Sequence, residues 1–382
     1  MTEFTYIADE LLLEAQEKTG LSDFGSQTFK QGLEQLCLTY DNNGFSEKGR
    51  KRHRRRLVDL LQARLRIEQS FKDYPAILDE EVRAPMFLTG LPRTGTSALL
   101  NLLANDTDAR PLKLWEGMMP DPCEGFKHGE DDPRYLMMKA WQEEQNKKNP
   151  DFSKIHHTTA DTPEECIHLL NHTFQDVQFG METMMEPYGS WFQQQDLTES
   201  YDYYAKLLNM LQWQRPGNRW LLKTPGHLWA LDQLTRLYPD CSIIITHRNP
   251  LQAVTSYCSM MHALMKERTY NPKTLGPVVM EYLARKVEAS LVQRENIDNS
   301  RIFDGQFNDF IKDSLGFVDT IYQYFNLPMS NQTATAFKTY ADQHPMGKHG
   351  KHHYQLEEYG LTEQLVLDRF SFYIEHFQVP ID

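Results

Sequence analysis

The stretch Ala84-Pro-Met-Phe-Leu-Thr-Gly-Leu-Pro-Arg-Thr-Gly-Thr-Ser-Ala-Leu-Leu100 decides the fold of this chain. Its apolar run over residues 86–89 predicts a buried strand, and the apolar segment over residues 97–104 predicts a helix. Between them lies a loop that is bounded by Gly90 and Gly95. A strand, a glycine-bounded loop and a helix in this order build a cradle for an anion, because backbone N–H groups of the loop and of the helix N-terminus point at one place.

The loop has the spacing of a phosphate-binding P-loop, Gly-x-x-x-x-Gly-Lys-Ser/Thr, with one change. Thr96 occupies the position of the lysine, and Ser97 follows it. The P-loop lysine reaches the β- and γ-phosphates of a nucleoside triphosphate, so its absence argues against ATP or GTP. Arg93 places a cation inside the loop instead. We therefore expect this loop to bind a phosphate group of a different ligand.

Length and composition restrict the class of protein. The chain has 382 residues, 40% hydrophobic and 12% aromatic, which suits a large α/β domain with helical additions. Its net charge of -13 argues against nucleic acid as the main partner. The five cysteines are scattered without a Cys-x-x-Cys pair, which indicates free thiols in a reducing cytoplasm and neither a zinc site nor a disulfide framework. Because the N-terminus lacks an apolar signal region and no apolar run approaches ~20 residues, we expect a cytoplasmic protein without a membrane span.

Two parts are expected along the chain: a helical N-terminal extension over residues 1–82, packed on an α/β domain over residues 83–382. Within the second part, apolar runs at residues 220–224 and 241–246 predict two further strands. Strands that alternate with helices predict a P-loop-type parallel sheet with helices on both faces, whose ligands bind at the carboxyl ends of the strands. Further helices are expected over residues 227–237, 251–265, 278–297, 317–325 and 361–376.

The N-terminal part contains the basic run Arg50-Lys-Arg-His-Arg-Arg-Arg56. One interpretation is a nuclear-localisation or polyanion-binding segment, and the other is the solvated face of an amphipathic helix. The acidic chain and the helical spacing of the apolar residues that follow favour the helix face.

A second group of polar residues follows the strand over residues 241–246. A P-loop ATPase places an aspartate at the end of such a strand to organise Mg²⁺. Here the strand runs into His247 and Arg248, and Ser256 lies about two helical turns further on. An arginine and a serine hydroxyl at a helix start predict a second anion site, although Arg248 in an ion pair with a surface acid is the alternative. Two phosphate sites without the lysine and the acid of an ATPase indicate a nucleotide with phosphates at both ends of its ribose, bound without an essential metal.

These motifs resemble the sulfotransferase family that uses 3′-phosphoadenosine 5′-phosphosulfate (PAPS). In that family a Pro-Lys/Arg-x-Gly-Thr-Thr/Ser loop holds the 5′-phosphosulfate, and Pro92-Arg-Thr-Gly-Thr-Ser97 matches it. An arginine after a central strand and a serine eight residues later hold the 3′-phosphate, as Arg248 and Ser256 do in spacing. The bacterial-type subgroup is matched further by Gly-Leu-Pro-Arg-Thr-Gly-Thr, Trp-Glu, Leu-Lys-x-Pro-x-His and His-Arg-x-Pro elements, at residues 90–96, 115–116, 222–227 and 247–250.

The resemblance implies a set of nucleotide-binding residues and no metal. PAPS is then the co-substrate and 3′,5′-phosphoadenosine (PAP) the product. The family's Arg-Lys-Gly motif, which closes over the nucleotide, has no identical copy, and Lys348-His-Gly350 is a basic, glycine-containing substitute or else a solvated loop. The implied binding residues are Arg93, Thr94, Gly95, Thr96, Ser97, Arg248, Ser256, Lys348, His349 and Gly350.

The resemblance also implies a general base that takes the proton of the acceptor hydroxyl. His227 lies two residues away from the position of a catalytic histidine in cytosolic sulfotransferases, and Glu116 lies near the position of a catalytic glutamate in some relatives. His156 and His157 are further alternatives. Each has a structural interpretation as well: a helix-start hydrogen bond for His227, an ion pair for Glu116, and capping or packing for the histidine pair. Lys223 and Arg93 are expected to act on the transferring group.

The acceptor is expected to be a hydroxylated small molecule. Its pocket is expected among aromatic and methionine residues of the middle of the chain, which are core residues in the alternative interpretation: Trp115, Met118, Phe179, Met184, Met185, Tyr188, Trp191 and Phe192. The motifs predict sulfuryl transfer from PAPS to a hydroxyl of this acceptor. A P-loop kinase or NTPase, and a PAP-binding protein without catalytic activity, are the alternatives.

Overall fold

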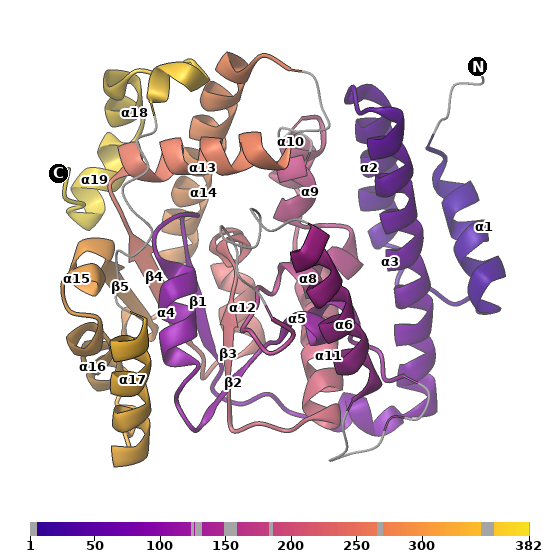
Figure 1. Cartoon of the computed structure of the whole chain (residues 1–382), viewed down its shortest axis with the longest axis horizontal. Helices are drawn as coiled ribbons and strands as arrows, with labels where there is room; N and C mark the ends of the chain where they lie inside the picture. The colour runs from indigo at the N-terminus through magenta and orange to yellow at the C-terminus, as the bar shows by residue number, and fades with distance from the viewer. Residues whose placement is uncertain are drawn as a thin grey trace.

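A computed structural model describes the protein over residues 6–123, 126, 132–148, 159–182, 186–265, 270–344 and 355–381. The central element is a five-stranded, all-parallel sheet in the order β2-β3-β1-β4-β5 (Figure 1). The α/β fold expected from the sequence is confirmed. Within the described part of the chain, no helix is both long and apolar enough to cross a membrane.

The three predicted strands form the middle of this sheet. They are β1 (Met86–Gly90), β3 (Arg219–Lys223) and β4 (Ser242–His247). Two edge strands, β2 (Ala109–Pro111) and β5 (Ile302–Gln306), were not expected from the sequence. The first has only three residues, and the second includes an aspartate and a glycine, which are depleted in strands.

Helices cover both faces of the sheet. Successive residues of β1 point to opposite faces, so they contribute to two different hydrophobic clusters. Met86 and Leu88 face a cluster with α4 (Thr96–Leu103), α16 (Ser314–Tyr324) and α17 (Asn331–Gln343). Phe87 faces the opposite cluster.

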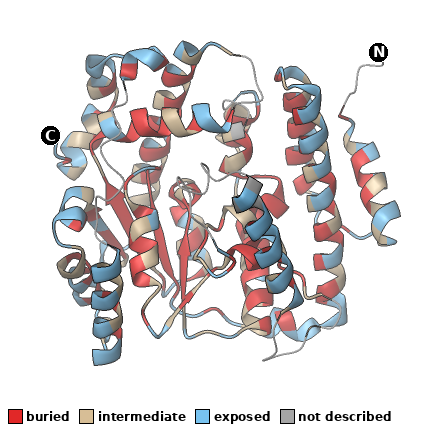
Figure 2. Ribbon diagram, viewed as in Figure 1, coloured by how far each residue is buried: buried red, intermediate tan, exposed pale blue. Residues whose placement is uncertain are grey.

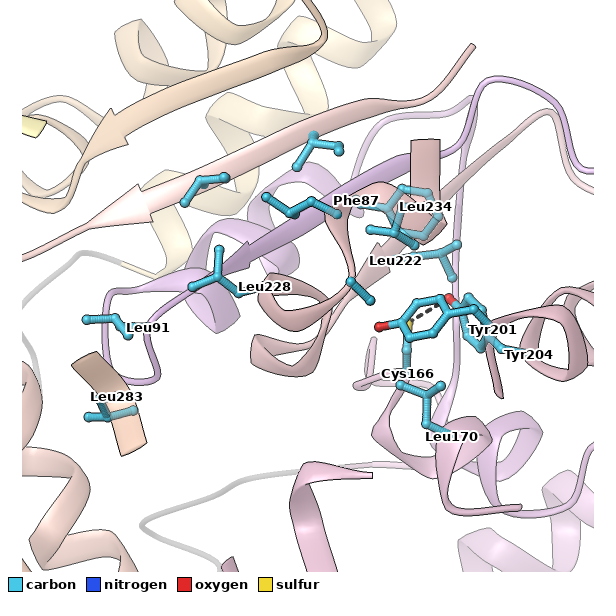
Figure 3. Close-up of a cluster of buried hydrophobic side chains, with 14 of the residues drawn as sticks. Phe87, Leu91, Cys166, Leu170, Tyr201, Tyr204, Leu222, Leu228, Leu234 and Leu283 are labelled. Carbon is cyan, nitrogen blue, oxygen red and sulfur yellow. Dashed lines mark hydrogen bonds between the residues drawn. The ribbon is translucent and has the colours of Figure 1, made fainter. Parts of the chain in front are cut away.

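That opposite cluster is the larger one and includes Leu222, Leu228 and Leu283 (Figure 3). Its helices are α11 (Thr198–Gln214), α12 (Leu231–Leu237), α13 (Pro250–Leu264) and α14 (Leu275–Arg294). The strands are buried between the two layers, whereas the outward faces of α1, α6 and α17 are exposed (Figure 2).

Three predicted helices are confirmed as α13, α14 and α16, but two others are interrupted. The segment 227–237 is a 3₁₀ turn, η3 (Pro225–Trp229), followed by α12, because Ala230 leaves the helical conformation with φ -144°. The segment 361–376 forms two short helices, α18 (Glu363–Arg369) and α19 (Ser371–Phe377). Periodicity alone did not reveal these breaks, since apolar residues continue at helical spacing across them.

The N-terminal helices α1 (Ala8–Thr19), α2 (Phe29–Asn42) and α3 (Glu47–Asp73) stand at one end of the molecule (Figure 1). They share an apolar cluster with Phe174, Phe179 and Tyr188 of the middle of the chain.

The basic run forms part of α3, in which Arg50 pairs with Asp41, Lys51 with Glu47, Arg54 with Glu14 and Arg55 with Asp59. The favoured interpretation of this run, a helix face, agrees with its place in α3. The remaining elements are η1 (Pro75–Asp79), α5 (Leu114–Met118), α6 (Pro133–Lys148), α8 (Ile167–Leu170), η2 (Asn171–Thr173), α9 (Val177–Glu182), α10 (Tyr188–Phe192), η4 (Pro272–Thr274), η5 (Asn299–Arg301), α15 (Phe307–Lys312) and η6 (Leu356–Tyr359).

Candidate active site

The glycine-bounded loop joins β1 to α4 in a conformation that its two glycines permit. Gly90 has φ +143° and Gly95 has φ +85°, values that side chains rarely adopt. A Cβ atom at Gly90 would lie 2.6 Å from the carbonyl oxygen of Thr246, and one at Gly95 would lie 2.7 Å from the ring of Phe307. Arg93 also has a positive φ, 71°, so the loop is strained at a residue that is not glycine.

The N-terminus of α4 closes this loop without a side-chain cap, because Gly95 occupies the N-cap position. Its first N–H groups therefore make a site for an anion. Thr96 is buried and Ser97 is exposed. The hydroxyl of Thr94 points inward, where it donates to the carbonyl oxygen of Leu91 and lies 2.7 Å from the hydroxyl of Thr246. Thr94 thus holds the loop with its side chain and has only its backbone N–H to offer a ligand.

The structure brings together the two predicted phosphate sites. Nε of Arg93 donates to Oγ of Ser256 on α13 over 3.0 Å, and Nη1 of Arg248 donates to the carbonyl oxygen of Arg93 over 2.7 Å. The guanidinium of Arg248 lies over the ring of Phe307, 4.3 Å from its centroid, and its backbone N–H donates to the hydroxyl of Tyr373. Residues from β1, β4 and α13 therefore form one cationic surface at the carboxyl ends of the strands.

A third group of polar residues lies beside the loop, at the end of β3. Lys223 is 2% exposed; its ammonium group donates to Oγ of Ser97 over 3.0 Å and pairs with the carboxylate of Glu165. The hydroxyl of Thr224 lies 3.5 Å from Oε2 of the same glutamate. The backbone N–H of Cys166 donates to the carbonyl oxygen of Lys223 over 2.8 Å, which fixes the adjacent Glu165 against the strand end. The side chain of Glu165 keeps 26% of its surface exposed.

Known proteins with a similar sequence and fold are sulfotransferases. The model of the sulfotransferase family matches residues 85–331, which is more than half of the chain. The chain belongs to the sulfotransferase family. The sulfotransferase STF1 from Mycobacterium tuberculosis H37Rv is 30% identical, with a TM-score of 0.86 over 96% of this chain and 99% of that one. The sulfotransferase STF9 from Mycobacterium avium is 27% identical, with a TM-score of 0.88 over 99% of both chains. No curated protein sequence matches the chain.

Glu116 of this sulfotransferase lies in a closed ion-pair cluster. It is 1% exposed on α5; Oε1 accepts from Arg110 over 2.7 Å and from Arg215 over 2.9 Å, and Oε2 accepts from the same two arginines over 2.8 and 3.0 Å. The backbone N–H of Lys113 also donates to Oε2. Burial opposes ionisation of this carboxyl, but Arg110 and Arg215 outweigh it and hold its pKa at about 2. This arrangement is the ion pair that the sequence left open as an alternative to a catalytic role.

His227 is fully buried in η3. Its Nδ1 lies 3.0 Å from the hydroxyl of Tyr201, the edge of its ring packs against Phe87, and Nε2 has no hydrogen-bond partner within the described residues. Burial lowers the pKa of this imidazole to about 3, and the positive charge of Lys286 lowers it further in the same direction. His227 is therefore neutral at physiological pH.

Other predicted residues are either in the core or outside the described residues. Trp115 lies in a small cluster with Leu114 and Met138, and Phe179, Tyr188 and Phe192 lie in the cluster that they share with the N-terminal helices. These aromatic residues thus have the core role that the sequence left open. Met118 is 42% exposed and Trp191 is half-buried. The predicted residues outside the described part are His156, His157, Met184, Met185, Lys348, His349 and Gly350.

Glu165 was not predicted as a site residue. It follows Thr162-Pro-Glu in a loop, and its partner Lys223 lies 58 residues away in sequence. The sequence feature that could have pointed to Glu165 is the pair of adjacent acids, Glu164 and Glu165, just before a buried segment. Throughout the described part of the chain, no group of three or more histidine, cysteine, aspartate or glutamate residues is placed to hold a metal ion.

Proposed function

We propose that this sulfotransferase transfers the sulfuryl group of PAPS to a hydroxyl group of a small-molecule acceptor. One observation carries the proposal: Arg93 and Arg248 join the two phosphate sites next to the Lys223–Glu165 pair. A nucleotide with phosphates at both ends of its ribose suits a cationic surface with two adjoining phosphate sites, and PAPS supplies an activated sulfuryl group there.

The residues present suit the 5′ end of this nucleotide. The uncapped N-terminus of α4 and the loop glycines allow a phosphate to approach the backbone closely, and Arg93 adds a fixed positive charge. Negative charge develops on the departing 5′-phosphate, and donors that are already in place stabilise it at no cost of reorganisation. We assign this role to Arg93 and to the N–H groups of residues 94–97, with the hydroxyl of Ser97.

The residues of the second cationic region suit the 3′-phosphate. Arg248 is held in position by Tyr373, Phe307 and the carbonyl oxygen of Arg93. Ser256 is 8% exposed on the adjacent helix and already accepts a hydrogen bond from Arg93. A guanidinium and a hydroxyl group that lie next to the loop can bind a phosphate by charge-assisted hydrogen bonds.

We infer that Glu165 is the general base, rather than His227 or Glu116. Glu165 is partly exposed and pairs with Lys223, which also donates to Ser97 of the loop, whereas His227 is fully buried and Glu116 is enclosed by two arginines. As the acceptor oxygen forms its bond to sulfur and the bond from sulfur to the phosphate oxygen breaks, the acceptor proton passes to the carboxylate of Glu165. Lys223 orients this carboxylate and places its positive charge next to the transferring group.

Two measurements test the proposal. PAP without Mg²⁺ should raise the unfolding temperature of the protein, and ATP with Mg²⁺ should not; the reverse would favour a P-loop kinase or NTPase. Transfer of labelled sulfate from PAPS to a panel of hydroxylated acceptors then separates an enzyme from a PAP-binding protein without activity. The intact Lys223–Glu165 pair supports the enzyme.

A further inference from the structure

His247 is a buried polar residue at the end of β4, directly before Arg248. Alternate residues of a strand point to one face of the sheet, and Ile243 and Ile245 lie in the larger hydrophobic cluster. His247 continues this alternation and is 2% exposed. An apolar side chain would fill such a position without the cost of burying polar atoms. Packing alone therefore does not explain a histidine at this place.

A hydrogen bond and an aromatic contact hold the imidazole of His247. Its Nε2 lies 2.8 Å from Oδ1 of Asp304 on β5, and this carboxylate also accepts from both Nη atoms of Arg294 over 2.8 and 2.6 Å. A carboxylate only accepts, so Nε2 carries the hydrogen. The ring of Phe377 on α19 stacks on the imidazole, with the centroids 4.0 Å apart. The imidazole is thus fixed between a charged pair and an aromatic ring.

Helix α19 holds the backbone of Arg248 as well. The hydroxyl of Tyr373 accepts the backbone N–H of Arg248 over 3.2 Å. Nε2 of Gln306 on β5 donates to the carbonyl oxygen of Phe377 over 2.8 Å, which fastens α19 to the edge of the sheet. Tyr373 and Phe377 are four residues apart and so lie on one face of the helix. This face contacts the two successive residues at the end of β4.

The direction of the Arg248 side chain depends on this strand end. Nη1 donates to the carbonyl oxygen of Arg93 over 2.7 Å, and Nε donates to Oε1 of Gln252 over 3.0 Å. The guanidinium lies at the end of a long side chain, so a small rotation of the backbone displaces its nitrogen atoms further. Hydrogen bonds weaken steeply as their geometry departs from the ideal. A phosphate bound by Arg248 is therefore sensitive to the groups that fix its backbone.

We propose that His247 is a positioning residue for Arg248 in the recognition of the 3′-phosphate. It makes no contact with the nucleotide; it fixes the end of β4 through Asp304 and Phe377. Tyr373 contributes by holding the backbone of Arg248. Together these contacts give the protein its preference for nucleotides that carry a 3′-phosphate. This inference rests on the proposed function, in which Arg248 binds that phosphate.

The test measures how much the 3′-phosphate contributes to binding. The affinities for PAP and for adenosine 5′-monophosphate (AMP), which lacks this phosphate, are determined by titration calorimetry, and their ratio is the preference for PAP. The wild-type protein is compared with His247→Met, His247→Gln and Tyr373→Phe. Ile243→Val is the matched control, because Ile243 is fully buried on the same face of β4.

The preference for PAP should fall by roughly 5- to 10-fold in His247→Met, less than the loss expected for Arg248→Ala, since the arginine is displaced but still present. Tyr373→Phe should lower it by about 3- to 5-fold, as one neutral hydrogen bond is lost. AMP affinity should stay unchanged in both variants. His247→Gln should keep the wild-type preference, because its amide nitrogen is as many bonds from Cβ as Nε2 and donates to Asp304. Ile243→Val should also keep it.

A double-mutant cycle shows whether His247 acts through Arg248. In an Arg248→Ala background, His247→Met should change the preference for PAP by less than about twofold, because the residue to be positioned is gone. An undiminished effect in that background would mean that His247 acts on the nucleotide by another route, and would overturn the inference.

An unchanged preference in either His247→Met or Tyr373→Phe also overturns the inference, so Tyr373→Phe decides it if His247→Met does not fold. Equal loss of affinity for PAP and AMP overturns it as well, because that result shows a purely structural histidine. Failure of His247→Gln to restore the preference has the same consequence. If the wild-type protein binds PAP no more tightly than AMP, the proposed function is contradicted instead, and the wild-type measurement thus distinguishes the two failures.

Discussion

Two glutamates near the carboxyl ends of strands have similar sequence contexts but different surroundings in the fold. Glu116 follows β2 at the edge of the sheet, and Glu165 pairs with Lys223 at the end of β3, close to the loop over residues 90–97. Both form ion pairs with basic residues. Glu116 is paired through both oxygens with two arginines and is 1% exposed, whereas Glu165 is paired with one lysine and its side chain is 26% exposed.

We propose that the number of donors around each carboxylate, together with its burial, separates a structural glutamate from one that can accept a proton. Five hydrogen bonds to Glu116 leave no lone pair directed at a ligand. Glu165 keeps 26% of its side-chain surface exposed, and its partner Lys223 contacts Ser97. We therefore expect removal of the charge of Glu116 to affect stability, and removal of the charge of Glu165 to affect catalysis.

The largest expected effect is on catalysis, in Glu165→Gln. Loss of the proposed general base should lower kcat by about 10²- to 10⁴-fold, because the amide cannot take the acceptor proton. The variant should still bind PAP, since the proposed nucleotide contacts come from the loop and from Arg248. Steady-state transfer of labelled sulfate, together with PAP titration, measures both quantities. A kcat within a few-fold of wild type would assign the base to another residue.

The next effect is on stability, in Glu116→Gln. Removing this charge leaves the guanidinium of Arg110, which is 3% exposed, without its counter-ion. Breaking a buried pair in this way costs about 3 kcal/mol of the free energy of unfolding. Urea denaturation measures the loss, with Glu165→Gln as the control, whose destabilisation should be smaller. Equal destabilisation by the two variants would remove the distinction between the two clusters.

A smaller effect is expected for the arginines of the nucleotide site. Arg248→Ala should weaken PAP binding by about 10- to 100-fold, since a hydrogen bond to a charged group contributes about 1.5–3 kcal/mol. Arg93→Ala should mainly slow transfer, because its guanidinium is assigned to the charge of the departing phosphate. Calorimetric PAP affinity and kcat separate the two roles. Equal loss of affinity and of rate in both variants would contradict this division.

The last prediction concerns the pH dependence of the Glu116 cluster. The pKa of Glu116 is about 2 in the folded protein and 4.5 for a glutamate in an unstructured chain, so the ionised carboxylate stabilises the fold above about pH 4.5. This contribution is lost as the pH falls through the folded pKa, because the unfolded chain binds the proton first. The destabilisation by Glu116→Gln should therefore decrease from about 3 kcal/mol near pH 7 to roughly 1.4 kcal/mol near pH 3. Denaturant unfolding at both pH values tests this, and a pH-independent difference would contradict it.

Part of the fold could be predicted from local sequence patterns. The loop from Gly90 to Ser97 and the strands β1, β3 and β4 carry strong local signals, namely the glycine spacing of the loop and short apolar runs, which are β-branched in β4. The strands β2 and β5 depend on pairing with an existing sheet edge, which local propensity does not encode. The break after η3 was hidden for a similar reason, since apolar spacing continues across Ala230.

Some residues of the candidate site could also be predicted from the sequence. Arg93, Lys223, Arg248 and Ser256 could be proposed from the sequence because they lie at the ends of predicted strands or at fixed spacing from them. Glu165 was missed because its significance comes from Lys223, a partner from a distant part of the sequence. In the same way, only the folded structure shows that His227 is buried and that two arginines enclose Glu116.

The most direct test of the comparison is the single-turnover rate of sulfate transfer from PAPS in Glu165→Gln and Glu116→Gln, each normalised to its PAP-binding sites. Normalisation removes the difference in the amount of folded protein. We predict that Glu116→Gln transfers at close to the wild-type rate per site and that Glu165→Gln is slower by about 10²-fold or more. The opposite order of the two rates would contradict the assignment of Glu165 as the general base.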